Sequence, residues 1–135
     1  MQSLLTMQDQ PTPAEILTAV AAFLKTVTGP QIAPHTAFQL RVAANALEMA
    51  ARDITLSPAE DAAEHARLTA LLGQDGGLLD LNAELARRIE TGEADLATPG
   101  LAEHLWATTL AKLAVDQPNY SGYRAALAER ANKKA

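Results

Sequence analysis

Two four-residue signatures, one near the start of the chain and one near its middle, mark where helices begin. They are Thr12-Pro13-Ala14-Glu15 and Ser57-Pro58-Ala59-Glu60. In such a capping box the hydroxyl accepts the N–H of the third helical residue, and the glutamate reaches back to the cap backbone. Proline suits the first helical position, where no N–H donor is needed. Both signatures therefore predict a helix N-terminus, with Thr12 and Ser57 as the N-caps.

Further signals predict where helices end. Gly29-Pro30, Gly73 and Gly92 stand where a left-handed residue commonly terminates a helix. Pro118 cannot continue one, because it lacks an N–H donor, and Thr98-Pro99 marks one more start. Together these signals predict six helices, over residues 13–28, 35–54, 58–72, 78–91, 99–116 and 121–132.

The composition agrees with helices throughout. Alanine and leucine dominate and aromatic residues make up only 4% of the chain, whereas strands favour aromatic and β-branched residues. Short connections favour antiparallel neighbours. We expect an all-α, single-domain bundle of five to six antiparallel helices with short loops, over residues 11–135. Residues 1–10 are expected to be a disordered segment or an extension, with Met7 as an alternative start.

Apolar spacing predicts which helix faces point inward. In helix 13–28 the stripe is Ile16, Val20, Phe23 and Val27. Helix 35–54 has two seams, one of Leu40, Ala44, Leu47, Ala51 and Ile54, the other of Phe38, Val42 and Met49. Apolar residues on two sides indicate a central helix, which we expect to pair with helix 99–116. In helix 78–91 the inward residues are Leu78, Leu81, Leu85 and Ile89, with Glu84 and Arg88 paired outside.

Charge and residue usage exclude several classes of protein. The chain has no cysteine, so disulfides, thiolate nucleophiles and cysteine-ligated metals are excluded. The net charge is −5 and the basic runs are only Arg87-Arg88 and Lys133-Lys134, which disfavours nucleic acid. No apolar run approaches the roughly 20 residues of a membrane span, and no signal peptide is evident. We expect a cytoplasmic protein.

Motifs for metal binding or catalysis are also missing. His35, His65 and His104 lack the spacing of three or four residues that a helical metal site needs. The loop Gly73–Gly77 has no phosphate-binding lysine, and no serine stands in a nucleophile elbow. We therefore expect no metal, no cofactor and no catalytic residue. Whether the protein is an enzyme stays open, and the sequence leans against it.

One polar pattern remains as a candidate site. Arg41, Asn45, Glu48 and Arg52 recur at i, i+4, i+7 and i+11, a polar ribbon on the otherwise apolar helix 35–54. Buried charges need partners, and the late residues Lys112, Asp116 and Tyr120 could supply them. We expect Arg41 and Asn45 to contact the segment Asp116–Tyr120. Three interpretations stay open: a solvent-exposed stripe, a buried structural network, or a ligand pocket.

Two stretches that contain these residues resemble a known family. They are Arg41–Leu47 with Arg52-Asp53, and Lys112–Ser121; Pro11–Leu24 and Ala63–Gly73 are also similar. The family is a bacterial domain-of-unknown-function family encoded beside aminoglycoside-phosphotransferase-like kinases and acyl-CoA dehydrogenases. Trp106 departs from the family's pattern, which has a more polar residue there.

The resemblance implies an all-α fold and an accessory role near acyl-CoA metabolism, without established catalytic residues. We expect a non-catalytic helical accessory or interaction protein whose partner is a phosphotransferase-like kinase or an acyl-CoA dehydrogenase. The alternative is a domain or minor enzyme that binds acyl-CoA or phosphorylated acyl-CoA through Arg41, Asn45 and Arg52. A homodimer is left open.

Overall fold

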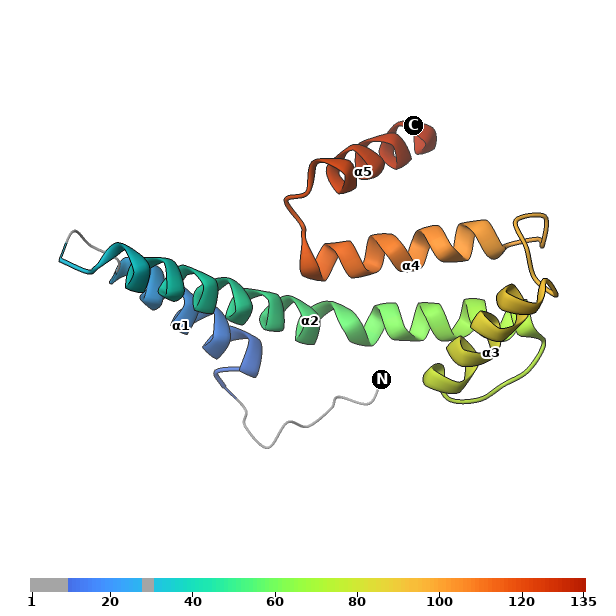
Figure 1. Ribbon diagram of the computed structural model, residues 1–135, viewed down its shortest axis with the longest axis horizontal. Coiled ribbons are helices and arrows are strands. Elements are labelled where there is room, and N and C mark those ends of the chain that lie inside the picture. Colours follow the sequence, from blue (N-terminus) through green and yellow to red (C-terminus); the bar gives the residue numbers. More distant parts are fainter. Residues whose placement is uncertain (1–9, 28–30) are drawn as a thin grey trace. The chain divides into compact units, whose positions relative to one another are not determined.

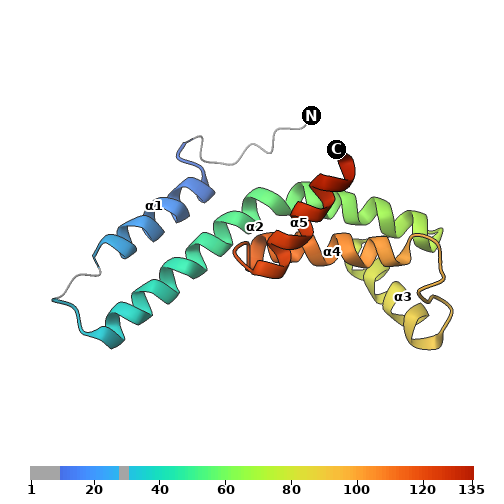
Figure 2. The same ribbon diagram turned by 90° about the horizontal axis from the view of Figure 1, so that it is seen from above.

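The computed structural model describes residues 10–27 and 31–135 (Figures 1 and 2). Within them the protein has no strand and five helices: α1 (Pro13–Thr26), α2 (Pro34–Leu72), α3 (Leu78–Thr91), α4 (Leu101–Asp116) and α5 (Ser121–Lys134). The all-α prediction is confirmed. The interpretations of residues 1–9 and of Gly29-Pro30 lie outside the described residues.

The helices fall into two compact units, Met1–Leu56 and Ser57–Ala135. The first unit contains α1 and the N-terminal part of α2, and the second contains the rest of α2 with α3, α4 and α5. The expected antiparallel bundle and single domain stay predictions, and each unit is described by itself below.

The first predicted capping box is confirmed. The Glu15 N–H donates to the Thr12 hydroxyl at 3.2 Å, and the Thr12 N–H donates to the Glu15 carboxylate at 2.7 Å. Pro13 occupies the first position of α1, as predicted. The helix begins here because two of its otherwise unsatisfied N-terminal donors find local acceptors.

The second predicted capping box is wrong. Ser57 lies inside α2, which runs without interruption from Pro34 to Leu72 with Pro58 in its interior. The predicted helices 35–54 and 58–72 are therefore one helix, and the number of helices falls from six to five among the described residues. A proline inside a helix removes one hydrogen bond at a cost of about 3 kcal/mol. Leu56, Ala59 and Glu60 beside it are good helix formers.

In the first unit, α1 lies alongside the N-terminal part of α2 (Figures 1 and 2). The buried side chains there, among the residues described, are three alanines, Ala21, Ala44 and Ala51. The predicted inward stripe of α1 is outside instead: Ile16, Val20, Phe23 and Val27 are all exposed. Alanines let two helix backbones approach closely, and the half-buried Leu17 and Leu24 flank this contact, whereas the predicted stripe of α1 does not take part in it.

The second unit has a leucine core. It is formed by Leu68, Leu72, Leu81, Leu85, Ala94 and Leu101, with Leu78 packed against it. The predicted inward positions Leu81 and Leu85 of α3 are confirmed, whereas Ile89 is exposed. Helix α3 thus buries about two turns of its predicted apolar stripe, and α5 contacts α4 (Figure 1).

Arg88 ties the end of α2 to α3. Gly73 adopts the left-handed conformation predicted for it, with φ of 66°. The Arg88 guanidinium donates to the Leu72 carbonyl at 3.2 Å and to Glu84 at 2.8 Å. Hydrogen bonds from Arg87 and Arg88 lower the pKa of Glu84 to about 2. The predicted Glu84–Arg88 pair is confirmed, and Arg88 also satisfies a carbonyl at a helix C-terminus.

Two left-handed glycines mark one helix end that was predicted and one helix start that differs from the prediction. Helix α3 ends, as predicted, before Gly92, whose φ is 78°. Helix α4 begins at Leu101 rather than 99, because Gly100 is its N-cap and has a φ of 84°. The Thr98 hydroxyl instead accepts the Asp95 N–H within the preceding turn, at 3.0 Å.

A buried histidine joins α2 and α4 within the second unit. His104 is only 2% exposed. Arg67 donates from Nε to His104 Nδ1 at 3.1 Å and from its terminal nitrogen to the Thr108 hydroxyl at 3.3 Å. Burial, followed by the positive charge of Arg67, lowers the pKa of His104. Since Nδ1 accepts this hydrogen bond, the neutral ring carries its proton on Nε2.

We expect Thr12→Ala to lower the free energy of unfolding by about 1 kcal/mol, the usual effect of losing an N-cap. Urea denaturation followed by circular dichroism at 222 nm measures it. Thr26→Ala, at the other end of α1, is the matched control. Equal stabilities for wild type and Thr12→Ala would contradict the role of the capping box.

We expect His104 to make the protein less stable as the pH falls below about 6.5, the ordinary histidine pKa. The folded state holds this pKa low, so the unfolded state binds more protons between the two values and stability rises with pH there. In His104→Asn the amide oxygen still accepts from Arg67 but does not titrate. Between pH 7.5 and pH 5 the melting temperature should therefore fall further for the wild type than for His104→Asn. An equal fall in both proteins would contradict the lowered pKa of His104.

Candidate functional site

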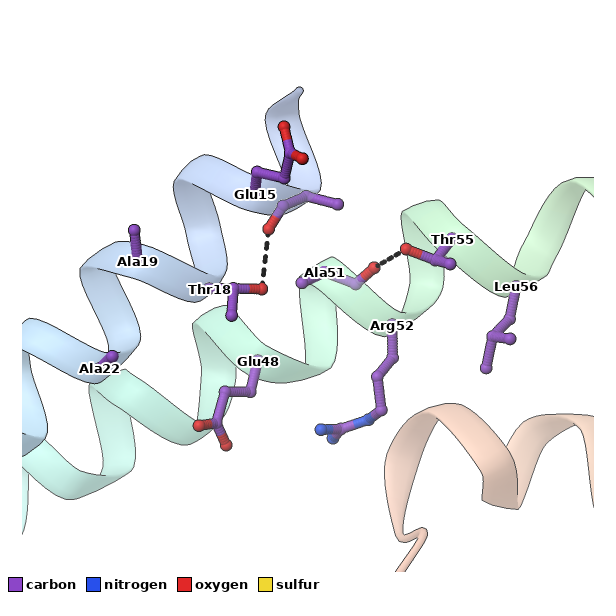
Figure 3. A pocket seen from close by; sticks show the side chains of 10 residues that line it. Glu15, Thr18, Ala19, Ala22, Glu48, Ala51, Arg52, Thr55 and Leu56 are labelled. Atoms are coloured by element: carbon purple, nitrogen blue, oxygen red, sulfur yellow. Dashed lines mark hydrogen bonds between the residues drawn. The ribbon is translucent and has the colours of Figure 1, made fainter. Parts of the chain in front are cut away.

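The first unit contains a groove of about 700 Å³ between α1 and α2 (Figure 3). Each helix contributes five residues to its lining: Ala14, Glu15, Thr18, Ala19 and Ala22 from α1, and Glu48, Ala51, Arg52, Thr55 and Leu56 from α2. Most of these side chains are small, because the two helices approach each other on alanines. The groove is therefore a direct result of the alanine packing.

Most polar groups of the groove already have partners. The Thr18 hydroxyl donates to the Ala14 carbonyl and the Thr55 hydroxyl to the Ala51 carbonyl, each at 2.8 Å (Figure 3). Glu15 is held by the capping box. Glu48 accepts a charged hydrogen bond of 2.6 Å from Lys25 of α1. This ion pair is partly exposed, so it fixes the register of the hairpin more than it stabilises it.

The structure divides the predicted site residues between the two units. Glu48 and Arg52 are half-buried and line the groove. Arg41 and Asn45 are exposed on α2 and do not line it. The remaining three, Lys112, Asp116 and Tyr120, are exposed in the second unit. The predicted contact between Arg41 or Asn45 and Asp116–Tyr120 stays a prediction.

The polar ribbon shares its side of α2 with exposed apolar residues. We call Phe38, Val42 and Met49 the α2 seam; Phe38 and Val42 are 57% and 51% exposed. With Asn45 these residues recur at spacings of four, three and four, so they occupy one side of the helix. Arg41 and Arg52 lie along the edge of this side. The expected burial of α2 on two sides is therefore not observed for the α2 seam.

Sequence reasoning missed two cations that hold side chains in place. Lys25, the only basic residue of α1, pairs with Glu48. Arg67 pairs with His104 across 37 positions of sequence. Lys25 could have been noticed because it is the one basic residue on a helix of mostly small and apolar residues. No local sequence pattern connects Arg67 to His104.

The groove offers binding groups and not a catalytic set. Its lining contains no histidine, serine or cysteine to serve as a nucleophile or neutral base. Across residues 10–27 and 31–135 there is no group of three or more His, Asp or Glu side chains placed to hold a metal ion. In the same residues no helix combines the length and the apolar character needed to cross a membrane.

Comparisons place the chain in a family. Curated proteins and solved structures gave no match. A family model described as "Domain of unknown function (DUF6285)" matches residues 30–120. This region contains α2, α3 and α4 and all seven predicted site residues, and leaves α1 and α5 outside. Because the match covers more than half of the chain, the protein belongs to the DUF6285 family of domains of unknown function.

Proposed function

We propose that the protein is a non-catalytic accessory protein that binds a partner protein through the α2 seam and the adjoining ribbon. The observation that supports this most is the exposure of Phe38 and Val42 beside Arg41 and Asn45. Aromatic residues, methionine and arginine are the residue types enriched at protein interfaces. Burying one large apolar side chain stabilises a protein by about 1.5–3 kcal/mol. An interface over these residues would gain this hydrophobic free energy.

The resemblance to domains encoded beside two classes of enzyme suggests the partner. We propose a phosphotransferase-like kinase or an acyl-CoA dehydrogenase. The ribbon contributes two guanidinium groups at the edge of the α2 seam, Arg41 and Arg52, each suited to bidentate pairing with a carboxylate. The partner surface should therefore be apolar with acidic residues at its rim.

A second candidate function is small-molecule binding in the groove, with acyl-CoA or a phosphorylated acyl-CoA as ligand. The groove volume and the presence of Arg52 in its lining favour this alternative. The charges weigh against it, because two carboxylates, Glu15 and Glu48, accompany one guanidinium in the lining. A polyanionic ligand would have to enter beside them, so the protein-binding proposal is preferred.

We expect Val42→Asp to weaken binding of the partner at least tenfold, because it buries an unpaired carboxylate in the interface. The measurement is capture from the native host with mass spectrometry, followed by calorimetry with the purified kinase or dehydrogenase. Leu79→Asp, at an exposed position of α3, is the matched control and should bind as wild type does. Equal loss in both variants, or binding by neither enzyme class, would contradict the proposal. Saturable binding of an acyl-CoA that Arg52→Gln abolishes would favour the second candidate instead.

The ribbon's proposed link to the second unit has its own test, a double-mutant cycle of Arg41→Ala and Asp116→Ala. Both side chains are exposed, so each single change should cost less than about 1 kcal/mol. A contact between them predicts a coupling energy of roughly 0.5 kcal/mol in the cycle, measured by urea denaturation. Strictly additive effects would show that the two residues do not interact.

A further inference from the structure

Two polar side chains of α2, one turn apart, bind two different helices of the second unit. Glu64 accepts a side-chain N–H of Asn82 on α3 at 3.1 Å. Arg67 donates from Nε to Nδ1 of His104 on α4, also at 3.1 Å. Residues three apart on a helix are neighbours on its surface. The contact to α3 and the contact to α4 therefore start from adjacent positions on α2.

The Arg67–His104 hydrogen bond exists only while the His104 ring is neutral. A protonated imidazole carries a donor on each ring nitrogen and accepts nothing. Uptake of a proton therefore removes this hydrogen bond and leaves two cations facing each other. The ring is buried, so little water is available to weaken their repulsion. Arg67 then needs a different partner.

The charges that act on the His104 ring come from α2. Burial, followed by the charge of Arg67, lowers the pKa of His104, and the charge of Glu64 raises it. Among the described residues, no charged side chain of α3, α4 or α5 adds to these two. The other polar contact of Arg67 is neutral, the Thr108 hydroxyl on α4. Glu64 is thus the carboxylate that acts on the ring, and it lies three residues from Arg67.

Glu64 can leave Asn82 at a small cost. The Asn82 amide nitrogen also donates to the Leu78 carbonyl of its own helix at 3.1 Å, so it keeps one hydrogen bond. Glu64 and Asn82 are both half-buried, which lets water replace the other hydrogen bond. Two opposite charges attract each other more strongly than a carboxylate attracts a neutral amide. A cation left without its former partner therefore competes well for Glu64.

We propose that Glu64 is the moving part of a proton-operated switch: when His104 takes up a proton, Glu64 moves from Asn82 of α3 to the cations Arg67 and His104. A proton bound on α4 then releases a contact of α3, through α2. Protonated histidines that exchange partners in this way are a known kind of pH switch. The contact of Arg88 with the Leu72 carbonyl, farther along α3, involves neither group and should stay in place. Because the folded protein lowers the pKa of His104, the exchange should occur below about pH 6.5.

Nuclear magnetic resonance of the ¹⁵N-labelled full chain tests the proposal between pH 7.5 and pH 5. The ring nitrogens of His104 report its protonation, and the side-chain NH₂ of Asn82 reports its hydrogen bond to Glu64. The Asn82 shift should follow the His104 titration with the same midpoint. His104→Asn should abolish this response, because its amide oxygen still accepts from Arg67 and takes up no proton. His65→Gln, next to Glu64 in the chain, is the matched control and should leave the response unchanged.

Glu64→Gln keeps the proposal testable should His104→Asn fail to fold. Glutamine still accepts from Asn82 but has no charge, so the Asn82 response should disappear. Loss of the carboxylate should also move the His104 titration at least about 0.3 pH unit lower. An Asn82 shift that stays constant while His104 titrates, or a response kept in His104→Asn or lost in His65→Gln, would overturn the proposal. A His104 ring that stays neutral down to pH 5 would overturn it too.

Discussion

The contact between α1 and α2 rests on alanine, and the other features of the first unit depend on that choice. Among the residues described in this unit, the buried ones are Ala21, Ala44 and Ala51. Small side chains bring the helices close and open a groove beside the contact. Several large apolar residues of the first unit are exposed, among them Phe23 of α1 and Phe38 and Val42 of the α2 seam. The three alanines themselves contribute little hydrophobic free energy to this contact.

The second unit differs from the first in that large side chains form its core. Large leucines fill its interior, and polar groups beside them are paired: Arg88 bonds a helix-end carbonyl and Arg67 holds the buried His104. Buried polar groups of this kind cost free energy unless they are hydrogen-bonded. These hydrogen bonds offset the cost of burying polar groups beside the leucine core.

Local signals in the sequence predicted local structure well. Thr12 and Gly92 were identified correctly because a cap depends only on neighbouring residues. Ser57 carries the same signature, but it lies inside α2. The signature alone does not tell whether the residues before it are also helical. Spacing showed that Ile16, Val20 and Phe23 share one side of α1. The spacing could not show that the side of α1 with Ala21 packs against α2, because that depends on how closely the two helices approach.

The candidate site was predicted only in part, for a similar reason. The ribbon on α2 follows from periodicity, and two of its members, Glu48 and Arg52, do line a groove. Lys25 and the small residues of α1 that complete the groove come from a different helix. Their involvement depends on the register between α1 and α2, and a single sequence does not encode register in any local pattern.

Pro58 has a consequence for how α2 opens. A proline donates no N–H, so the carbonyl of Ile54, four residues earlier, lacks its usual helical donor. The ladder of hydrogen bonds that makes a helix cooperative is therefore interrupted close to the boundary between Leu56 and Ser57. Protection of backbone amides against hydrogen exchange should then differ on the two sides of this position. Residues before it would exchange as one group with α1, and residues after it would exchange with the leucine core, within a single continuous helix.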